Sequence, residues 1–312
     1  MLKILFQLNK FNPNVFYETG IDIEGIIVIK NNNETQIFSD ALVYDGLVEK
    51  YPKYKIKKLN LSQFSKILKN EIVYLDEEHI DLKGKQFIEK YAKKIKDIAP
   101  SYSLKRMKKK KNEIELIKIA VKIAEDAVIK ANGETEEDLR FKIIEEMSKN
   151  RSIESFPTIV ANKKHSRFPH YIPNQSKLDT ITLIDRGARY KNYCSDMTDT
   201  LIDKKEKKAS IIYEKLESIF YDLIDIIPSL EYGEDVHNTS IKLFKKYKIK
   251  QMPHLIGHGI GIEVHEWPRL MPKSKDKLEG TVIALEPSYY NKEFGLRFER
   301  NIYIGKNKVR IL

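Results

Sequence analysis

The chain has 312 residues, a formal net charge of +11 and an apolar fraction of 41%. This length predicts about two domains, and the apolar content is sufficient for packed cores. No stretch approaches the ~20 consecutive apolar residues that a membrane-spanning helix needs, and residues 1–6 lack a signal-peptide pattern. The single cysteine, Cys194, excludes an internal disulfide framework and fits a reducing compartment. We therefore expect a cytoplasmic protein that does not associate with membranes.

The excess of positive charge suggests nucleic acid as a possible partner. However, the lysines are spread along the chain, and the densest basic run, residues 105–111, contains no interleaved aromatic residues. This composition is more typical of a solvated linker or a helix start, so nucleic-acid binding is not expected.

Residues 1–104 are predicted to form a small α/β domain. Apolar runs predict strands at 15–17, 25–29 and 72–75, and helical spacing predicts helices at 61–68 and 82–98. The run Asn31–Asn33 predicts a hairpin turn. This segment shows no cluster of catalytic residue types.

Residues 105–312 are predicted to form the second domain. An amphipathic pattern beginning at residue 112 predicts a long helix that stops near Gly133. Thr135 and Asp138 are spaced like an N-terminal capping arrangement for the next helix. Further helices are expected at about 205–227 and 235–247. Strands are expected at 158–161, 180–185, 194–201, 261–265, 282–286 and 297–304. Helices packed on one face of a mostly antiparallel sheet make an α+β fold.

Two carboxylates lie in apolar strand-like segments of this second domain. Asp185 ends one such segment and Asp196 begins the next, with a polar turn between them. A hairpin would place both side chains on one face, where a buried anion is costly unless it is paired or bound to metal.

Three later segments supply residues of the same kind. His258 is flanked by glycines that allow close backbone packing, Glu286 ends an apolar strand, and Glu299 lies between apolar neighbours. Several converging anions repel one another unless a cation neutralises them. Carboxylates with one imidazole suit a pair of divalent ions, either Mn, Co, Fe or Zn.

Other catalytic motifs are absent or incomplete. The segment 265–269 begins like a zinc-protease helix, but Arg269 stands where the second histidine is required. Cys194 lacks a neighbouring histidine and is expected to be a small buried residue instead of a nucleophile.

Together these residues resemble the metallopeptidase family of methionine aminopeptidase, Xaa-Pro aminopeptidase and prolidase, which has the pita-bread fold. The matching segments cover most of the chain: 168–171, 183–187, 195–200, 257–268, 285–287 and 295–299. Residues 14–20 resemble the smaller N-terminal domain of the Xaa-Pro branch, which methionine aminopeptidases usually lack.

The resemblance implies a role for each matching residue. Asp185 would bind one metal ion, Asp196 and Glu299 would bridge both ions, and His258 and Glu286 would hold the second. Glu286 would also shuttle a proton to the leaving nitrogen. The other implied site residues are His170 and His265 as hydrogen-bond donors to substrate, His254 near the pocket, Arg269 for the substrate carboxylate, and Arg297 as a partner that orients Glu299.

The resemblance therefore implies a dinuclear metallopeptidase that cleaves Xaa-Pro dipeptides, with Arg269 as the discriminating residue. An aminopeptidase acting on longer proline-containing peptides is the alternative. A non-catalytic binding protein of this fold is disfavoured because all five ligands are present, and a creatinase-like hydrolase is disfavoured because that branch does without metals. Members of this branch are commonly homodimers.

Four positions depart from the family pattern. Asp199 stands where relatives carry arginine, which implies an altered or reversed ion pair. Ser288 replaces a glycine, and Lys163 and His165 replace small or amide residues in the loop before His170. The loop changes leave the substrate preference open.

Overall fold

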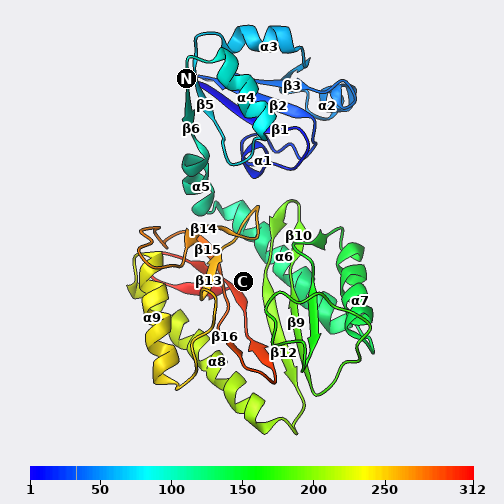
Figure 1. Ribbon diagram of the computed structural model, residues 1–312, viewed down its shortest axis with the longest axis vertical. Helices are drawn as coiled ribbons and strands as arrows, with labels where there is room; N and C mark the ends of the chain where they lie inside the picture. The colour runs from blue at the N-terminus through cyan, green and yellow to red at the C-terminus, as the bar shows by residue number, and fades with distance from the viewer. Residues whose placement is uncertain (33) are drawn as a thin grey trace. The chain divides into compact units, whose positions relative to one another are not determined.

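The computed structural model describes residues 1–32 and 34–312 and divides into two compact units, Met1–Lys105 and Arg106–Leu312 (Figure 1). The boundary lies one residue beyond the one expected from the sequence. Among the described residues, no helix has both the length and the apolar character needed to cross a membrane.

The first unit is built on one six-stranded sheet with strand order β4-β3-β2-β1-β5-β6. Its strands are β1 (Leu2–Gln7), β2 (Ile26–Asn31), β3 (Glu34–Ser39), β4 (Lys55–Lys58), β5 (Ile72–Leu75) and β6 (Lys94–Asp97). Its helices are α1 (Pro13–Thr19), α2 (Tyr44–Lys50), α3 (Leu61–Leu68) and α4 (Leu82–Tyr91), and α5 (Ala99–Met107) begins in it. Successive strand residues point to opposite faces, so Ile4 and Leu5 of β1 enter different apolar clusters.

Three sequence predictions for this unit need comment. The strand predicted at 15–17 is wrong, because Asn12 caps a helix that has Pro13 in its first turn and ends at Gly20 in a left-handed conformation. The helix predicted at 82–98 ends at Tyr91, and β6 follows it. In the predicted turn, Asn31 ends β2 and Asn32 has a positive φ, whereas Asn33 lies outside the described residues.

The second unit contains small antiparallel sheets and long helices. Its strands are β7 (Ile153–Glu154), β8 (Ile159–Asn162), β9 (Ile181–Arg186), β10 (Ala188–Tyr190), β11 (Tyr193–Cys194), β12 (Met197–Ile202), β13 (Gly257–Gly259), β14 (Glu266–Arg269), β15 (Thr281–Leu285), β16 (Ser288–Tyr290), β17 (Gly295–Arg297), β18 (Arg300–Ile304) and β19 (Val309–Ile311). Its helices are α6 (Lys111–Lys130), α7 (Glu136–Lys149), α8 (Lys207–Ile226) and α9 (Gly233–Lys246), with a 3-10 turn at Ile227–Ser229.

The helices of this unit follow the predicted pattern closely. The Thr135 hydroxyl accepts a hydrogen bond from the Asp138 N–H at 3.1 Å, and the Asp138 carboxylate accepts one from the Thr135 N–H, which completes the expected capping box of α7. The strand predicted at 261–265 is wrong, because the chain bends there between β13 and β14.

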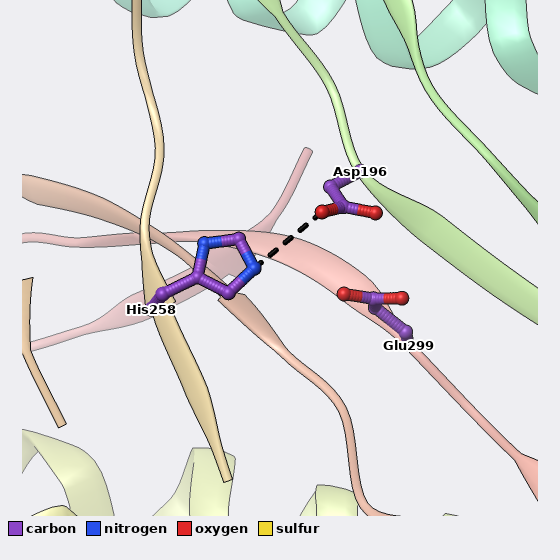
Figure 2. A group of neighbouring side chains, drawn as sticks. All are labelled: Asp196, His258 and Glu299. Atoms are coloured by element: carbon purple, nitrogen blue, oxygen red, sulfur yellow. Dashed lines mark ion pairs between the residues drawn. The ribbon is translucent and has the colours of Figure 1, made fainter. Parts of the chain in front are cut away.

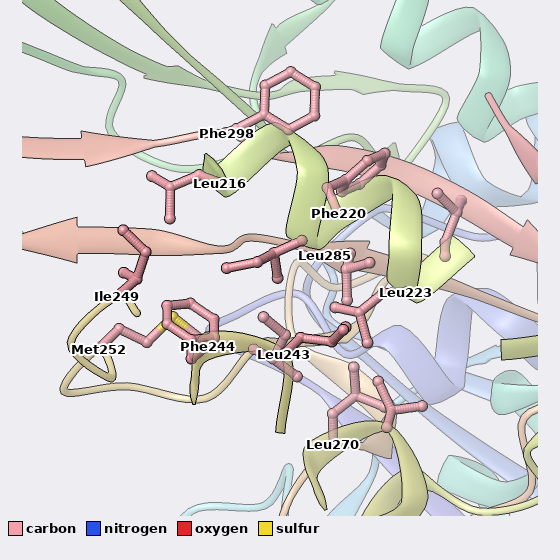
Figure 3. Close-up of a cluster of buried hydrophobic side chains, with 14 of the residues drawn as sticks. Leu216, Phe220, Leu223, Leu243, Phe244, Ile249, Met252, Leu270, Leu285 and Phe298 are labelled. Atoms are coloured by element: carbon pink, nitrogen blue, oxygen red, sulfur yellow. The ribbon is translucent and has the colours of Figure 1, made fainter. Parts of the chain in front are cut away.

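Two sheets of the second unit provide the strands that carry the candidate ligands. One has the order β12-β9-β8 and the other β14-β13-β15-β18-β19. Helices α8 and α9 pack on the second sheet around an apolar cluster that includes Phe220, Leu223, Phe244 and Leu285 (Figure 3). Because this core fixes α8 and β15 against each other, the strand ends that carry polar residues are held on a rigid frame.

Candidate metal centre

The Asp185–Asp196 hairpin exists as the sequence predicts. Strands β9 and β12 pair antiparallel with Asp185 opposite Thr198, and the turn residues Lys191 and Asn192 both have positive φ. Asp196 lies two residues before Thr198, so alternation along the chain directs it to the same face as Asp185. Both aspartates line one cavity of about 310 Å³.

His258 reaches this cavity from β13, which lies between β14 and β15. A Cβ at Gly257 would lie 2.0 Å from the Ala284 carbonyl oxygen, and one at Gly259 would lie 2.4 Å from the Trp267 backbone. Only glycine fits such close approaches, which explains why glycines flank the histidine.

Three side chains converge closely enough to hold one ion. Donor atoms of Asp196, His258 and Glu299 lie within 4.8 Å of one another, and Figure 2 shows the three side chains pointing toward a common centre. The Nε2 atom of His258 is 3.4 Å from Oδ2 of Asp196. Its Nδ1 lies 3.1 Å from the Gly259 carbonyl oxygen, to which it can only donate, so the neutral form of this imidazole carries its lone pair on Nε2.

The donor set therefore fits a divalent cation. In the neutral tautomer a lone pair on Nε2 faces a carboxylate oxygen, and a cation between them converts this unfavourable contact into ligation. In addition, Oδ1 of Asp185 is buried and has no hydrogen-bond partner among the described residues. A buried carboxylate oxygen without a donor is costly, and a metal ion satisfies it.

The carboxylates of the site raise one another's pKa. Burial is the largest cause of the raised pKa values of Asp196, Glu286 and Glu299, and repulsion from neighbouring carboxylates adds to it. Glu286 follows β15 and lines the same cavity as Asp185. The structure thus brings all five predicted ligand residues to one cavity.

Arg297 is the buried cation of this group. Its Nη2 forms an ion pair with Asp185, its Nε donates to the Thr198 hydroxyl at 2.9 Å, and Nε is 4.0 Å from Glu299. The Thr198 hydroxyl in turn donates to Glu299 at 2.7 Å. Arg297 therefore contacts Asp185 directly and reaches Glu299 mainly through Thr198.

The predicted histidines occupy different places. His170 and His265 line the cavity, whereas His254 lies beside it with Nδ1 3.6 Å from Glu286. Burial lowers the pKa of His254 and of His265 to about 4, with the other site histidines contributing. Both imidazoles are therefore neutral at pH 7 and can donate one hydrogen bond.

Arg269 does not line the cavity, although it lies opposite His258 in the β13–β14 pair. Its guanidinium is bound by Asp276, with Nε to Oδ2 at 2.9 Å and Nη2 to Oδ1 at 3.0 Å. Sequence reasoning found the arginine but not this carboxylate.

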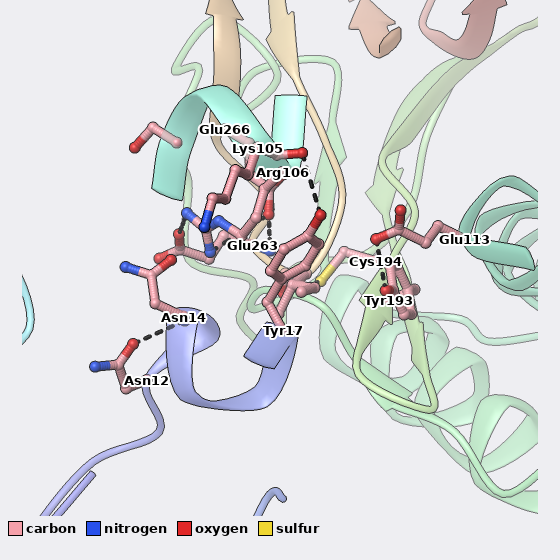
Figure 4. A network of polar contacts seen from close by, with 12 residues as sticks. Asn12, Asn14, Tyr17, Lys105, Arg106, Glu113, Tyr193, Cys194, Glu263 and Glu266 are labelled. Carbon is pink, nitrogen blue, oxygen red and sulfur yellow. Dashed lines mark hydrogen bonds and ion pairs between the residues drawn. The ribbon is translucent and has the colours of Figure 1, made fainter. Parts of the chain in front are cut away.

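The segment that carries His265 is anchored by two ion pairs, of which the one made by Glu266 is buried. Arg106 binds Glu263 at 2.6 Å (Figure 4), and Lys109 binds Glu266 at 2.9 Å. Cys194 adds a backbone hydrogen bond from its N–H to Gly261 at 2.7 Å. The expectation of a solvated basic run is therefore wrong for Arg106 and Lys109, which are 4% and 7% exposed.

Several cavity residues were not identified from the sequence. The apolar wall consists of Phe156, Pro157, Ile159, Ile172 and Val264. Tyr290 accepts a hydrogen bond from Nη1 of Arg297 at 3.2 Å. Apolar residues give no chemical signal of their own, whereas Thr198 could have been found from its alternation with Asp196.

Comparison with known proteins agrees with this geometry. The profile of the metallopeptidase family M24 matches residues 115–306. The chain is 35% identical to an uncharacterized peptidase of Methanocaldococcus jannaschii over 69% of this chain and 66% of that protein. It is 29% identical to a Xaa-Pro dipeptidase of Pyrococcus furiosus over 96% of this chain and 90% of the relative.

The fold agrees as well. The crystal structure of the prolidase from Pyrococcus horikoshii OT3 superposes with a TM-score of 0.88 at 25% identity, covering 99% of this chain and 92% of that chain. This likeness confirms the predicted α+β pita-bread fold. The chain belongs to the metallopeptidase family M24.

Proposed function

We propose that this protein is a dinuclear metal-dependent peptidase that hydrolyses the Xaa-Pro bond, with dipeptides as its substrates. The observation that carries the proposal is the convergence of the His258 Nε2 lone pair with Asp196 and Glu299 in a cavity. The likeness to a relative named Xaa-Pro dipeptidase supports the substrate class.

The proposed ligand roles follow the positions of the side chains. Asp185 would hold one ion, Asp196 and Glu299 would be shared by both ions, and His258 and Glu286 would hold the second, with Mn, Co, Fe or Zn as candidate metals. When bound, divalent ions supply Lewis-acid polarisation of the scissile carbonyl and lower the pKa of water. Arg297 orients Asp185 through their ion pair.

The protein's own groups then bind substrate and move the proton. Glu286 accepts the proton from water and delivers it to the leaving nitrogen. His265 is neutral and exposed at the cavity, so it can donate a hydrogen bond to the developing oxyanion, and His170, which lines the same cavity, is the second proposed donor. His254 lies beside Glu286, while its Nδ1 donates to the Leu255 carbonyl oxygen at 2.9 Å.

Arg269 supports the dipeptide preference, because a guanidinium can bind the free carboxylate of a substrate proline. It is the cross-strand partner of His258, which places it close to the site. The second candidate function is an aminopeptidase that acts on longer peptides. The engagement of Arg269 by Asp276 favours this alternative, because it leaves less of the guanidinium for a substrate.

We further propose that residues 105–312 form the catalytic domain and residues 1–104 a smaller accessory domain. A homodimer in the cytoplasm is proposed on the family resemblance.

The deciding experiment compares a Gly-Pro or Met-Pro dipeptide with a Xaa-Pro-Xaa tripeptide after EDTA treatment, with and without added Mn²⁺ or Co²⁺. Metal-dependent hydrolysis of the dipeptide is expected, and Glu286→Gln serves as the inactive control. Faster cleavage of the tripeptide would establish the aminopeptidase. Absence of hydrolysis of both substrates with every metal would refute the proposal that the protein is a peptidase.

A further inference from the structure

Three charged side chains outside the cavity form what we call the Asp199 cluster: Arg186, Asp199 and Arg300. Nη2 of Arg186 is 2.6 Å from Oδ2 of Asp199, and Nη2 of Arg300 is 2.5 Å from Oδ1. One carboxylate therefore holds two guanidinium groups, each by its own oxygen.

Each member of the cluster belongs to a segment that carries a proposed metal ligand. Arg186 follows Asp185, Arg300 follows Glu299, and Asp199 lies in β12, which begins directly after Asp196. The cluster thus joins the three segments whose spacing determines the metal site.

The cluster acts from the face of the sheet opposite to the cavity. In the β9–β12 pair, Asp185 lies opposite Thr198, whereas Ile184 lies opposite Asp199. Adjacent residues of a strand point to opposite faces, so Asp199 points away from the Asp185 side. It cannot touch substrate or metal, and any effect on the site must pass through the backbone.

The arginines provide that connection. Nη1 of Arg300 donates to the carbonyl oxygens of Thr198 at 3.0 Å and of Glu299 at 2.7 Å. Nη1 of Arg186 donates to the Met197 carbonyl oxygen at 3.1 Å. The Glu299 N–H also donates to the Thr198 carbonyl oxygen at 3.0 Å. By fixing both guanidiniums, Asp199 fixes the backbone on either side of the ligands.

The charges of the cluster make Asp199 necessary. The side chains of Arg186, Asp199 and Arg300 are 3%, 25% and 21% exposed, so solvent screens them incompletely. Without the Asp199 carboxylate, the guanidinium groups of Arg186 and Arg300 repel each other where β9, β12 and the Glu299 segment meet. An arginine at position 199, the residue of the family pattern, would bring three cations together here.

We propose that Asp199 is a positioning residue that sets the spacing of the Asp185, Asp196 and Glu299 segments and thereby the affinity for divalent metal. The inference rests on the metal site of the proposed function.

The test is calorimetric titration of the metal-free protein with Mn²⁺ for wild type and three variants. Asp199→Asn is expected to raise the Kd about 10-fold, the lower end of the range for groups that orient metal ligands. Asp199→Arg is expected to raise it further. The exchange Asp199→Arg with Arg300→Asp restores one opposite-charge pair and is expected to recover part of that loss.

The matched control is Asp222→Asn. Asp222 also accepts from two donors, Lys246 Nζ at 2.7 Å and Tyr247 Oη at 3.0 Å, and its side chain is 30% exposed. It joins α8 to α9 without touching a ligand segment, so its loss is expected to lower Tm and leave the Mn²⁺ Kd unchanged.

The decisive comparison is between the two asparagine variants, which keep the side-chain shape and are expected to fold. If Asp199→Asn lowers Tm as Asp222→Asn does but binds Mn²⁺ with the wild-type Kd, the cluster only stabilises the fold and the inference is overturned. If wild type itself binds no Mn²⁺, Co²⁺, Fe²⁺ or Zn²⁺, the proposed function fails and this inference with it.

Discussion

Arg269 and Asp276 form a two-point ion pair beside the metal centre, with N–O distances of 2.9 and 3.0 Å. The backbone N–H of Arg269 donates to the same carboxylate at 2.9 Å, and the guanidinium lies 4.1 Å from the centroid of the Trp267 ring. These contacts use Nε and Nη2, and no described residue accepts a hydrogen bond from Nη1. A substrate carboxylate would therefore meet a guanidinium that is already oriented but only partly available.

Replacing Arg269 by alanine tests whether it recognises the substrate carboxylate. Because one N–H edge remains for the substrate, we expect the KM for a Xaa-Pro dipeptide to rise about 10-fold with a smaller change in kcat. The KM for a tripeptide is expected to change less, since its carboxylate lies one residue further away. The control is Arg310→Ala, an exposed arginine that lies over the Tyr303 ring, for which both KM values should stay at wild type. An equal rise in KM for the dipeptide and the tripeptide would contradict the role of Arg269 in binding the substrate carboxylate.

The same ion pair predicts a pH dependence of stability. Burial opposes ionisation of Asp276, but hydrogen bonds from the Arg269 side chain and backbone outweigh it and lower the pKa. A lowered folded-state pKa gives a stabilisation that is complete above the unfolded value of about 3.9 and is lost as pH falls through the folded value. Asp276→Asn should therefore be less stable by about 1 kcal/mol at pH 7, a figure reduced because Arg269 is half exposed. Tm measured from pH 7 to pH 2.5 should converge for the two proteins, and a constant difference would contradict this origin.

Cys194 is predicted to be chemically inert in the folded protein. Burial raises the pKa of its thiol to about 11, and the side chain is 0% exposed. Since the thiolate is the reactive form, modification by a disulfide reagent at pH 8 should require unfolding. The native protein should react at least about 100-fold more slowly than the denatured protein, and Cys194→Ala should retain activity. Fast native modification would show that the β11 segment opens readily.

The buried Lys109–Glu266 pair should contribute to stability far more than an exposed pair of the same type. Lys109→Ala leaves the Glu266 carboxylate, which is 2% exposed, with the Glu263 N–H at 3.0 Å and Arg106 at 3.6 Å as its described partners, so a loss of about 3 kcal/mol is expected. The matched control is Lys122→Ala, which breaks an i,i+4 pair with Asp126 on the surface of α6 and should leave the free energy of unfolding nearly unchanged. Urea unfolding measures both, and similar values for the two variants would contradict the role of burial.

The polar residues of the candidate site could be predicted from the sequence, because they lie in short motifs whose neighbouring residues indicate a strand end or a close backbone approach. Asp185, Asp196 and the glycine-flanked His258 line one cavity, and the capping box of α7 follows from residues that are neighbours in the chain. Long-range pairing was not predictable. Lys109 meets Glu266 across a separation of 157 residues, and nothing local distinguishes it from the exposed lysines around it.

Residues 15–17 illustrate a second kind of failure. Val15, Phe16 and Tyr17 favour strands, yet the cap at Asn12 and the stop at Gly20 enclose them in a short helix. Capping contributes about 1 kcal/mol, and the helix also buries Val15 completely, so the context outweighs a local strand preference.

The Asp199 cluster also limits how this protein can exchange parts with its relatives. The family resemblance implies an arginine at position 199, where this chain has an aspartate whose two partners lie in separate segments. Grafting β12 alone from a relative with arginine at this position would place that arginine against Arg186 and Arg300. The three positive charges would then repel one another. The three positions thus form an epistatic unit, and a chimera or a reconstructed ancestor should remain functional only when β9, β12 and β18 are transferred together.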